Sequence, residues 1–170
     1  IRLCYAYSPQ VLPKPQDWPS HAHVSGYCFL NAPAGWQPPT EIVRFLASGP
    51  PPVYVGFGSM GKRRPDLASL VVSALRALGL RGLLAFDEAL PVDLRGPDMQ
   101  ACGVLWHDWL FPQLAALIHH GGAGTTGTAL KAGIPAVIAP IAVDQFFWAR
   151  RIHELGVGIS AGPLRSLSPE

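Results

Sequence analysis

A glycine-rich bend between two short apolar runs constrains the fold of this chain more than any other feature of its sequence. Residues 116–118 predict a buried strand, and the bend at residues 120–124 follows almost directly. A helical pattern then ends at Gly133, and residues 136–139 predict the next strand. Strand, bend and helix in this order place free backbone N–H groups, and the positive end of a helix, at the carboxyl edge of a parallel sheet.

The residue types in and after the bend predict a phosphate or diphosphate ligand. Glycines let the backbone approach a ligand closely because they carry no Cβ, while threonine hydroxyls and a histidine ring add hydrogen-bonding groups. The alternative is a plain strand-to-helix turn without a ligand, but such a turn needs one glycine and has no use for the other groups. The residues that carry the prediction are Gly121, Gly122, Gly124, His120, Thr125 and Thr126.

Apolar runs and helical patterns alternate along the chain from residue 52 onward. The expected strands are residues 53–57, 82–86, 102–105, 116–118, 136–139 and 157–160. The expected helices are residues 65–78, 110–115, the helix that ends at residue 133, and residues 144–155. This alternation predicts an α/β fold, a Rossmann-like doubly wound parallel sheet that binds ligands at the carboxyl ends of its strands.

The first part of the chain has a different character. Residues 1–50 are rich in proline and aromatic residues and lack helical periodicity, apart from a strand expected near residues 23–29 and a short helix at residues 41–47. We expect residues 1–50 to form an inter-domain segment packed on a domain of residues 51–170. The chain begins without methionine and ends where a helix would start, so we expect it to be part of a longer protein.

Composition excludes several classes of partner. Charged residues make up 14% of the chain and the formal net charge is +2, which is too weak a balance to predict binding to nucleic acid or an anionic membrane. The cysteines Cys4, Cys28 and Cys102 share no CxxC spacing and are odd in number, so we expect reduced thiols in a cytoplasmic protein. No apolar run approaches the roughly 20 residues of a membrane span, and peripheral association with a membrane is left open.

A second glycine pattern, at residues 56–61, satisfies G-x-G-x-x-G literally. In a dinucleotide-binding fold this pattern is accompanied by an acidic residue about 20 residues later, at the end of the second strand. Residues 76–81 contain no acid, Asp87 comes after the strand, and the glycines lead into a basic stretch instead of a helix. A nicotinamide cofactor is therefore the weaker alternative, and we favour a second phosphate contact through Ser59.

Several motifs in the same order resemble one family of enzymes. They are "PPVYVGFGSM", "HDWLFPQLAALIHHGGAGTT", "AGIPAVIAP" and "DQFFWARRIHELGVG", preceded by "YSPQVLPKPQDWP" and "SGYCFL". Together they resemble the carboxyl-terminal, donor-binding half of family 1 glycosyltransferases with GT-B architecture. Within that family the chain is most similar to sterol 3-β-glucosyltransferases and to bacterial enzymes that glycosylate macrolide and glycopeptide antibiotics.

The resemblance implies a role for each part of the motifs. Asp144 and Gln145 are similar to the acid and amide that bind hydroxyls of the donor sugar, although Asp144 also reads as an ordinary helix N-cap. The segment of residues 102–108 corresponds to the one that faces the nucleotide base, and its candidate contacts are Leu105, Trp106 and His107. Trp106 departs from the family, where proline is common, and could equally be a base-stacking residue or a packed surface aromatic. The diphosphate-binding candidates are Gly58, Ser59, His120, Gly122, Ala123, Gly124, Thr125 and Thr126.

The resemblance also implies an activity. It predicts inverting, metal-independent transfer of a hexose, with glucose as the default, from a UDP-sugar to a hydroxyl of a sterol-like or other lipophilic acceptor. The catalytic base and most of the acceptor site belong to the family's amino-terminal half, so we expect no catalytic residue and no transferase activity in this chain alone. Neither a cofactor nor a metal is expected, since His119 and His120 point to opposite faces and no third ligand follows. A stand-alone nucleotide-binding or regulatory module is the alternative.

Overall fold

The computed structural model describes residues 1–58, 64, 66–86 and 91–168. The chain separates into two compact units, Ile1–Leu30 and Asn31–Glu170. The larger unit contains a six-stranded sheet in which every pair of neighbouring strands is parallel. Its strands, in chain order, are β3 (Val53–Gly56), β4 (Gly82–Ala85), β5 (Met99–Ala101), β6 (Ala116–His119), β7 (Ala136–Ile138) and β8 (Gly158–Ser160).

The order of the strands in space is β5-β4-β3-β6-β7-β8. From β3 the chain winds outward through β4 to β5, then returns to the other side of β3 and winds outward again through β7 to β8. This is the doubly wound order, and it confirms the predicted fold class. The direction of winding changes between β3 and β6, where Gly56 is paired with His119 in register. The carboxyl ends of these two strands are therefore level and border the crevice in which such folds bind ligands.

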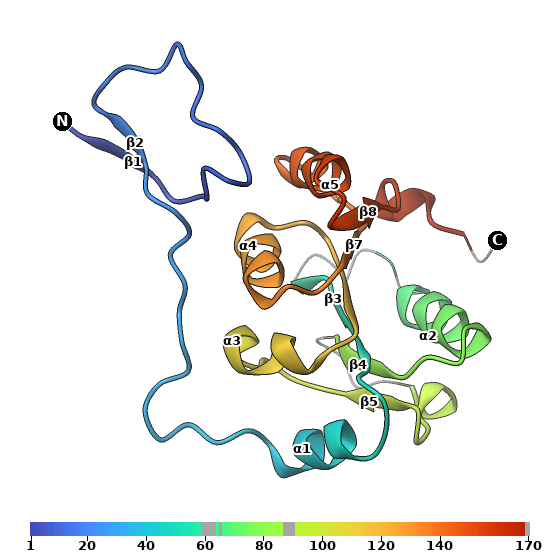
Figure 1. The fold of residues 1–170 in the computed structure, drawn as a ribbon. Coiled ribbons are helices and arrows are strands. Elements are labelled where there is room, and N and C mark those ends of the chain that lie inside the picture. The colour runs from blue at the N-terminus through green and yellow to red at the C-terminus, as the bar shows by residue number, and fades with distance from the viewer. Residues whose placement is uncertain (59–63, 65, 87–90, 169–170) are drawn as a thin grey trace. The chain divides into compact units, whose positions relative to one another are not determined.

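Helices cover both faces of the sheet, because alternate strand residues point to opposite sides. Tyr54 of β3 packs in one core cluster, whereas its neighbours Val53 and Val55 pack in the other. The first cluster also takes residues from α1 (Thr40–Ala47), α3 (His107–Leu110), α4 (Ala123–Ala132) and α5 (Gln145–Glu154), and the second takes residues from α2 (Leu67–Ala77). Figure 1 shows α3 and α4 on one side of the sheet and α2 on the other.

The predicted bend and helix of the central motif are present. His120 and the glycines after it connect β6 to α4, whose first backbone hydrogen bond runs from the Thr126 N–H to the Gly122 carbonyl at 2.9 Å. The N–H groups of the residues just before Thr126 have no acceptor within the helix and point out of its end. Gly133 ends the helix in a left-handed conformation with φ of 70°, as the sequence predicted.

Two elements between β4 and β6 differ from the prediction. The third strand of the sheet is Met99–Ala101 rather than residues 102–105, because the chain leaves the sheet at Gly103 and the apolar residues beyond it line a cavity instead. The helix expected at residues 110–115 begins earlier, as α3, and continues as a 3₁₀ turn at Phe111–Gln113. Pro112 has no backbone N–H to donate, so the α-helix does not extend through it.

The smaller unit, Ile1–Leu30, is built on two parallel strands, β1 (Leu3–Tyr5) and β2 (Ala22–Val24). The rings of Tyr5 and Trp18 pack with their centroids 4.1 Å apart. The predicted lead-in of residues 1–50 is thus divided between the two units, since α1 belongs to the core of the larger one. The packing of the lead-in segment on the domain stays a prediction. Three short 3₁₀ helices, Val92–Leu94, Phe111–Gln113 and Leu164–Ser166, complete the described elements.

No helix in the described parts of the chain is both long and apolar enough to cross a membrane.

Gly121 is the position in the central bend that tolerates least change. Its φ is +90°, and a Cβ there would lie 2.7 Å from Cγ2 of Ile138 and 3.1 Å from the Gln145 carbonyl. We predict that Gly121→Ala lowers the free energy of unfolding by roughly 1–3 kcal/mol through backbone strain alone, as measured by urea denaturation. Gly124→Ala is the control: a Cβ there meets nothing within 4 Å, so its stability should stay equal or rise. Equal stability of the two variants would contradict the prediction.

Candidate functional site

A cavity of about 410 Å³ opens at the carboxyl edge of the sheet. Its walls come from the residues that follow β3, β4, β5 and β6 and from the first turns of α3 and α4. It therefore occupies the crevice where the winding of the sheet reverses. The cavity has two chemically different ends: one is built from glycine, histidine and threonine, and the other from aromatic and apolar side chains.

The first end contains Gly58, His120 and Thr125. The backbone N–H groups of the first turn of α4 lie beside Thr125, and the positive end of the helix dipole is directed to the same place. Gly124 is exposed, and the space where its Cβ would be is open. This end of the cavity therefore presents N–H groups, a hydroxyl and an imidazole, all of which donate hydrogen bonds to an anion.

His120 is half-buried and sits over the glycine bend. A Cβ on Gly122 would lie 2.8 Å from its Nε2, so only glycine leaves room for the ring in this position. The Nδ1 atom is buried without a hydrogen bond of normal geometry. Burial lowers the pKa of His120, while the Gly56 backbone and the Asp144 carboxylate act in the opposite direction. A neutral ring with one N–H is therefore the form available to a ligand near neutral pH.

His119, the neighbouring histidine, faces the core and has no exposed surface. Its Nδ1 accepts a hydrogen bond from the Gly121 N–H at 3.1 Å, which holds the bend against the end of β6. Burial, with a contribution from the positive charge of His120 when protonated, lowers the pKa of His119 to about 3. The two side chains diverge, with ring planes at 81°, as the strand alternation predicted. His119 is thus a structural residue of the bend.

The pKa of His119 has a consequence for stability. Between about pH 6.5 and the folded pKa of about 3, the unfolded chain binds a proton at this site and the folded chain does not, so stability is lost as pH falls. His119 alone contributes a slope of up to about 1.4 kcal/mol per pH unit in this window. We predict that His119→Asn, whose Oδ1 can accept the Gly121 N–H, unfolds in urea with a weaker loss of stability between pH 7.5 and pH 5 than the wild type. Parallel losses would refute this assignment.

The second end of the cavity contains Tyr54, Cys102, Leu105 and His107. The His107 ring stacks on Phe111, with centroids 4.3 Å apart and planes 18° apart. Burial lowers the pKa of His107, raises that of the Cys102 thiol to about 12, and strongly raises that of Tyr54. All these groups are therefore neutral at neutral pH. They form an apolar wall with a flat, partly buried ring, which suits a planar heterocycle.

Trp106 does not line the cavity and instead precedes the first residue of α3. Of the three residues predicted to face a base, Leu105 and His107 lie on the cavity wall. The adjacent Asp108 accepts a hydrogen bond from the Ala32 N–H at 3.0 Å and so fixes the start of α3. Stacking by Trp106 is left without support from this geometry.

Asp144 and Gln145 lie in the turn between β7 and α5. The Asp144 carboxylate is exposed and accepts a hydrogen bond from Trp148 Nε1 at 2.9 Å, and it is close enough to His120 for its charge to raise the pKa of that ring. Gln145 is buried, and its Oε1 accepts the N–H groups of Ile141 and Ala142 at 2.8 and 3.0 Å. Asp144 thus offers oxygens at the surface, whereas the amide oxygen of Gln145 is used in building the turn.

The remaining residues predicted to bind a diphosphate either present no side chain to the cavity or lie outside the described residues. Thr126 is buried, and its hydroxyl donates to the Gly122 carbonyl at 3.0 Å within its own helix. Ala123 and Gly124 lie in the first turn of α4 and present backbone groups rather than side chains. Ser59 lies outside the described residues. In the described parts of the chain, no three histidine, cysteine or acidic side chains form a group that could hold a metal ion, and the metal-free character of the site stays a prediction.

Sequence reasoning missed Tyr54. Tyr54 shares the sheet face of Gly56, two residues later in the strand, and a Cβ on Gly56 would lie 2.7 Å from the tyrosine hydroxyl. The glycine thus makes room for the phenol beneath the cavity. The period of two along β3 was a usable signal for this pair. Cys102 was assigned to a strand, and its place in the cavity wall depends on where β5 ends.

Comparison with known proteins places this geometry in a family. Residues 87–168 match the family model described as "Erythromycin biosynthesis protein CIII-like, C-terminal domain". Over 98% of its length the chain is 43% identical to a sterol 3-beta-glucosyltransferase of Arabidopsis thaliana and 42% identical to the O-mycaminosyltylonolide 6-deoxyallosyltransferase of Streptomyces fradiae. The chain is a C-terminal domain of the family 1, GT-B glycosyltransferases. The resemblance inferred from the sequence motifs is confirmed.

Solved glycosyltransferases share the fold. UGT89C1 of Arabidopsis thaliana, complexed with quercetin, superposes with a TM-score of 0.80 at 18% identity, covering 99% of this chain and 45% of that one. The glycosyltransferase VinC, in complex with dTDP, gives a TM-score of 0.71 at 23% identity, covering 96% of this chain and 40% of that one. The chain spans 28% of the plant sterol enzyme and 39% of the Streptomyces enzyme.

Proposed function

We propose that this domain binds the donor of an inverting, metal-independent glycosyltransferase. The enzyme would transfer a hexose, most simply glucose, from a UDP-sugar to a hydroxyl of a sterol-like or other lipophilic acceptor. The observation that carries the proposal is the cavity at the reversal point of the sheet, where His120, Thr125 and the open end of α4 meet. The cytoplasmic location expected from the sequence stays a prediction.

The layout of the carboxyl edge follows the layout of a nucleotide sugar. The apolar end, with Leu105 and His107, suits a base. The donor-rich end, with His120 and Thr125, suits a diphosphate. Asp144, whose charge acts on His120, comes next along the edge after β7 and suits the hydroxyls of a sugar. The three parts occur in the order in which base, diphosphate and sugar are joined.

Related proteins support the choice of donor and acceptor. UGT89C1 has been solved with UDP-L-rhamnose, and VinC with dTDP, so proteins of this fold bind nucleoside diphosphates and their sugars. Two relatives, at 43% and 39% identity, are sterol 3-beta-glucosyltransferases of Arabidopsis thaliana. We take UDP-glucose and a sterol-like alcohol as the substrates to test first.

The proposed chemistry places the growing negative charge of the leaving diphosphate in front of α4. Fixed N–H dipoles stabilise such charge effectively, because they need no reorganisation when the sugar bond breaks. His120 donates a hydrogen bond from its neutral ring, and Thr125 adds a hydroxyl. With these donors we propose that no metal is required. The acceptor proton passes to a general base outside this chain, and the acceptor oxygen attacks the sugar carbon from the face opposite the diphosphate.

Binding of donor to the isolated chain tests the proposal. We predict heat of binding with both UDP and UDP-glucose in isothermal titration calorimetry, with no transfer of glucose by the chain alone. Thr125→Val removes a hydroxyl from the cavity wall and should weaken UDP binding roughly tenfold. Thr128→Val is the matched control, since the Thr128 hydroxyl bonds to the Gly124 carbonyl in its own helix at 2.9 Å. A folded chain that gives no heat with millimolar UDP refutes the proposal.

The role of Asp144 is tested by a comparison of two ligands. Asp144→Asn keeps an oxygen that can accept the Trp148 N–H and removes the negative charge. We predict that the variant loses roughly tenfold in affinity for UDP-glucose, because hydrogen bonds from sugar hydroxyls to a carboxylate are lost, and that its affinity for UDP is unchanged. Titration calorimetry of both ligands measures this, and equal losses for UDP and UDP-glucose would exclude a sugar contact.

A further inference from the structure

A second cavity, of about 650 Å³, lies next to the turn that carries Asp144 and Gln145. Residues 140–141 and Phe146 form one wall, and residues 163–165 with Arg64 form the other. Ile141 and Phe146 lie on either side of Asp144 and Gln145 in the chain. The cavity therefore begins where the proposed sugar contacts end, at the β7 end of the carboxyl edge.

The walls of this second cavity are largely apolar. Pro140, Ile141, Phe146 and Leu164 contribute hydrocarbon surface, and 46% of the Phe146 side chain is exposed although it is a large aromatic residue. A cavity of this size, lined mainly by apolar side chains with few polar groups, is typical of sites for small lipophilic molecules. The charged side chains of the lining are those of Arg64 and of Arg165, which is exposed.

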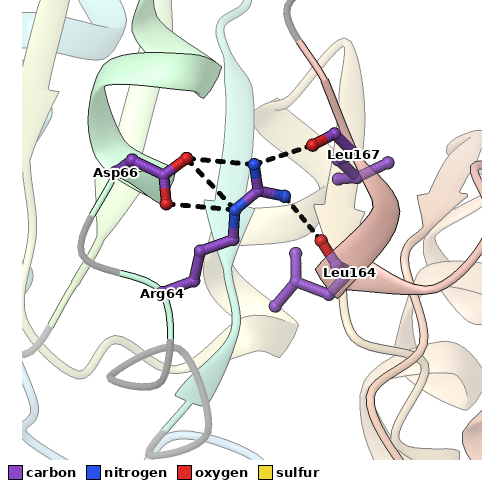
Figure 2. A network of polar contacts seen from close by, with 4 residues as sticks. All are labelled: Arg64, Asp66, Leu164 and Leu167. Atoms are coloured by element: carbon purple, nitrogen blue, oxygen red, sulfur yellow. Dashed lines mark hydrogen bonds and ion pairs between the residues drawn. The ribbon is translucent and has the colours of Figure 1, made fainter.

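Arg64 holds the far wall in place and is not available as an anion site. Its guanidinium donates to the carbonyl oxygens of Leu164 and Leu167 at 2.6 and 2.7 Å and pairs with Asp66 at 3.0 Å. Figure 2 shows the side chain reaching from the start of α2 to the segment that contains Leu164. All three nitrogen atoms of the group are occupied by these contacts. The cavity is thus bounded by a fixed wall.

The turn between the near-wall residues Ile141 and Phe146 is also fixed, and it contains a strained residue. Val143 has a φ of +54°, in the left-handed region that a β-branched residue rarely adopts. The Gln145 side chain imposes this turn by accepting the N–H groups of Ile141 and Ala142. Val143 is 89% exposed, so the free-energy cost of its backbone strain is not offset by packing inside this domain. Strained residues of this kind cluster at sites where a ligand is gripped.

We propose that this second cavity, one wall of which comes from the residues on either side of the Val143 turn, receives the apolar body of the acceptor. The inference rests on the proposed donor function, since it places the acceptor next to the sugar held at Asp144. A lipophilic alcohol would bury its hydrocarbon part against Ile141, Phe146 and Leu164, with its hydroxyl directed back toward the sugar. The domain that binds the donor then also contributes to the choice of acceptor.

The test uses the transferase that contains this domain, with UDP-glucose as donor and cholesterol in detergent micelles as the acceptor probe. Phe146→Ser removes the exposed aromatic wall, and Val143→Asn replaces the strained apolar side chain by one that tolerates a positive φ. We predict that Phe146→Ser raises the KM for cholesterol about tenfold and that Val143→Asn raises it about threefold. Neither variant should change kcat or the KM for UDP-glucose.

The control is Val92→Ser, which removes an exposed valine in a 3₁₀ turn that does not line this cavity. Calorimetric binding of UDP-glucose to each variant shows that the domain is folded and that the donor site is intact. Cholesterol KM values equal to that of Val92→Ser would overturn the acceptor assignment while leaving the donor function standing. A change in donor KM instead would assign the cavity to the sugar and equally overturn it. Absence of UDP-glucose binding in the wild type would refute the donor function itself.

Discussion

The reversal of winding between β3 and β6 is the constraint on which the rest of the domain depends. Parallel strands require helical crossovers, and the crossovers that leave β3 and β6 in opposite directions cannot cover the space directly above these two adjacent strand ends. In this chain Gly56 and His119 are paired at that point, so the chain leaves both strands at the same height. The crevice is therefore a result of connectivity, and the glycines keep it open.

The chemistry of the crevice follows from its burial. The histidines and the cysteine on or behind its walls have pKa values shifted toward the neutral form, because a charge there would lose its hydration. None of the described residues that line it is a lysine or an arginine. An anion in this space would thus be held by oriented N–H dipoles and neutral donors rather than by ion pairs, and such contacts depend strongly on geometry and only weakly on salt.

Much of this arrangement could be predicted from local patterns. The strand before His120 and the helix that ends at Gly133 follow from apolar runs and glycine punctuation, and the position of the helix end proposed to bind an anion follows from their order. The end of β5 could not be predicted, because Met99–Ala101 and the apolar residues after it look alike in sequence and only pairing with β4 separates them. The orientation of Thr126 and Gln145 was equally out of reach, since each side chain satisfies backbone groups created by the fold itself.

Arg64 gives the last described turn an importance that its position in the chain does not suggest. The bond from its guanidinium to the Leu164 carbonyl joins residues 100 positions apart, and the arginine side chain is only 16% exposed. If the chain were cleaved ahead of Leu164, the largely buried guanidinium of Arg64 would lose its hydrogen bonds to the Leu164 and Leu167 carbonyls. The segment after β8 therefore holds the start of α2 in place. Removal of this segment would destabilise the start of α2.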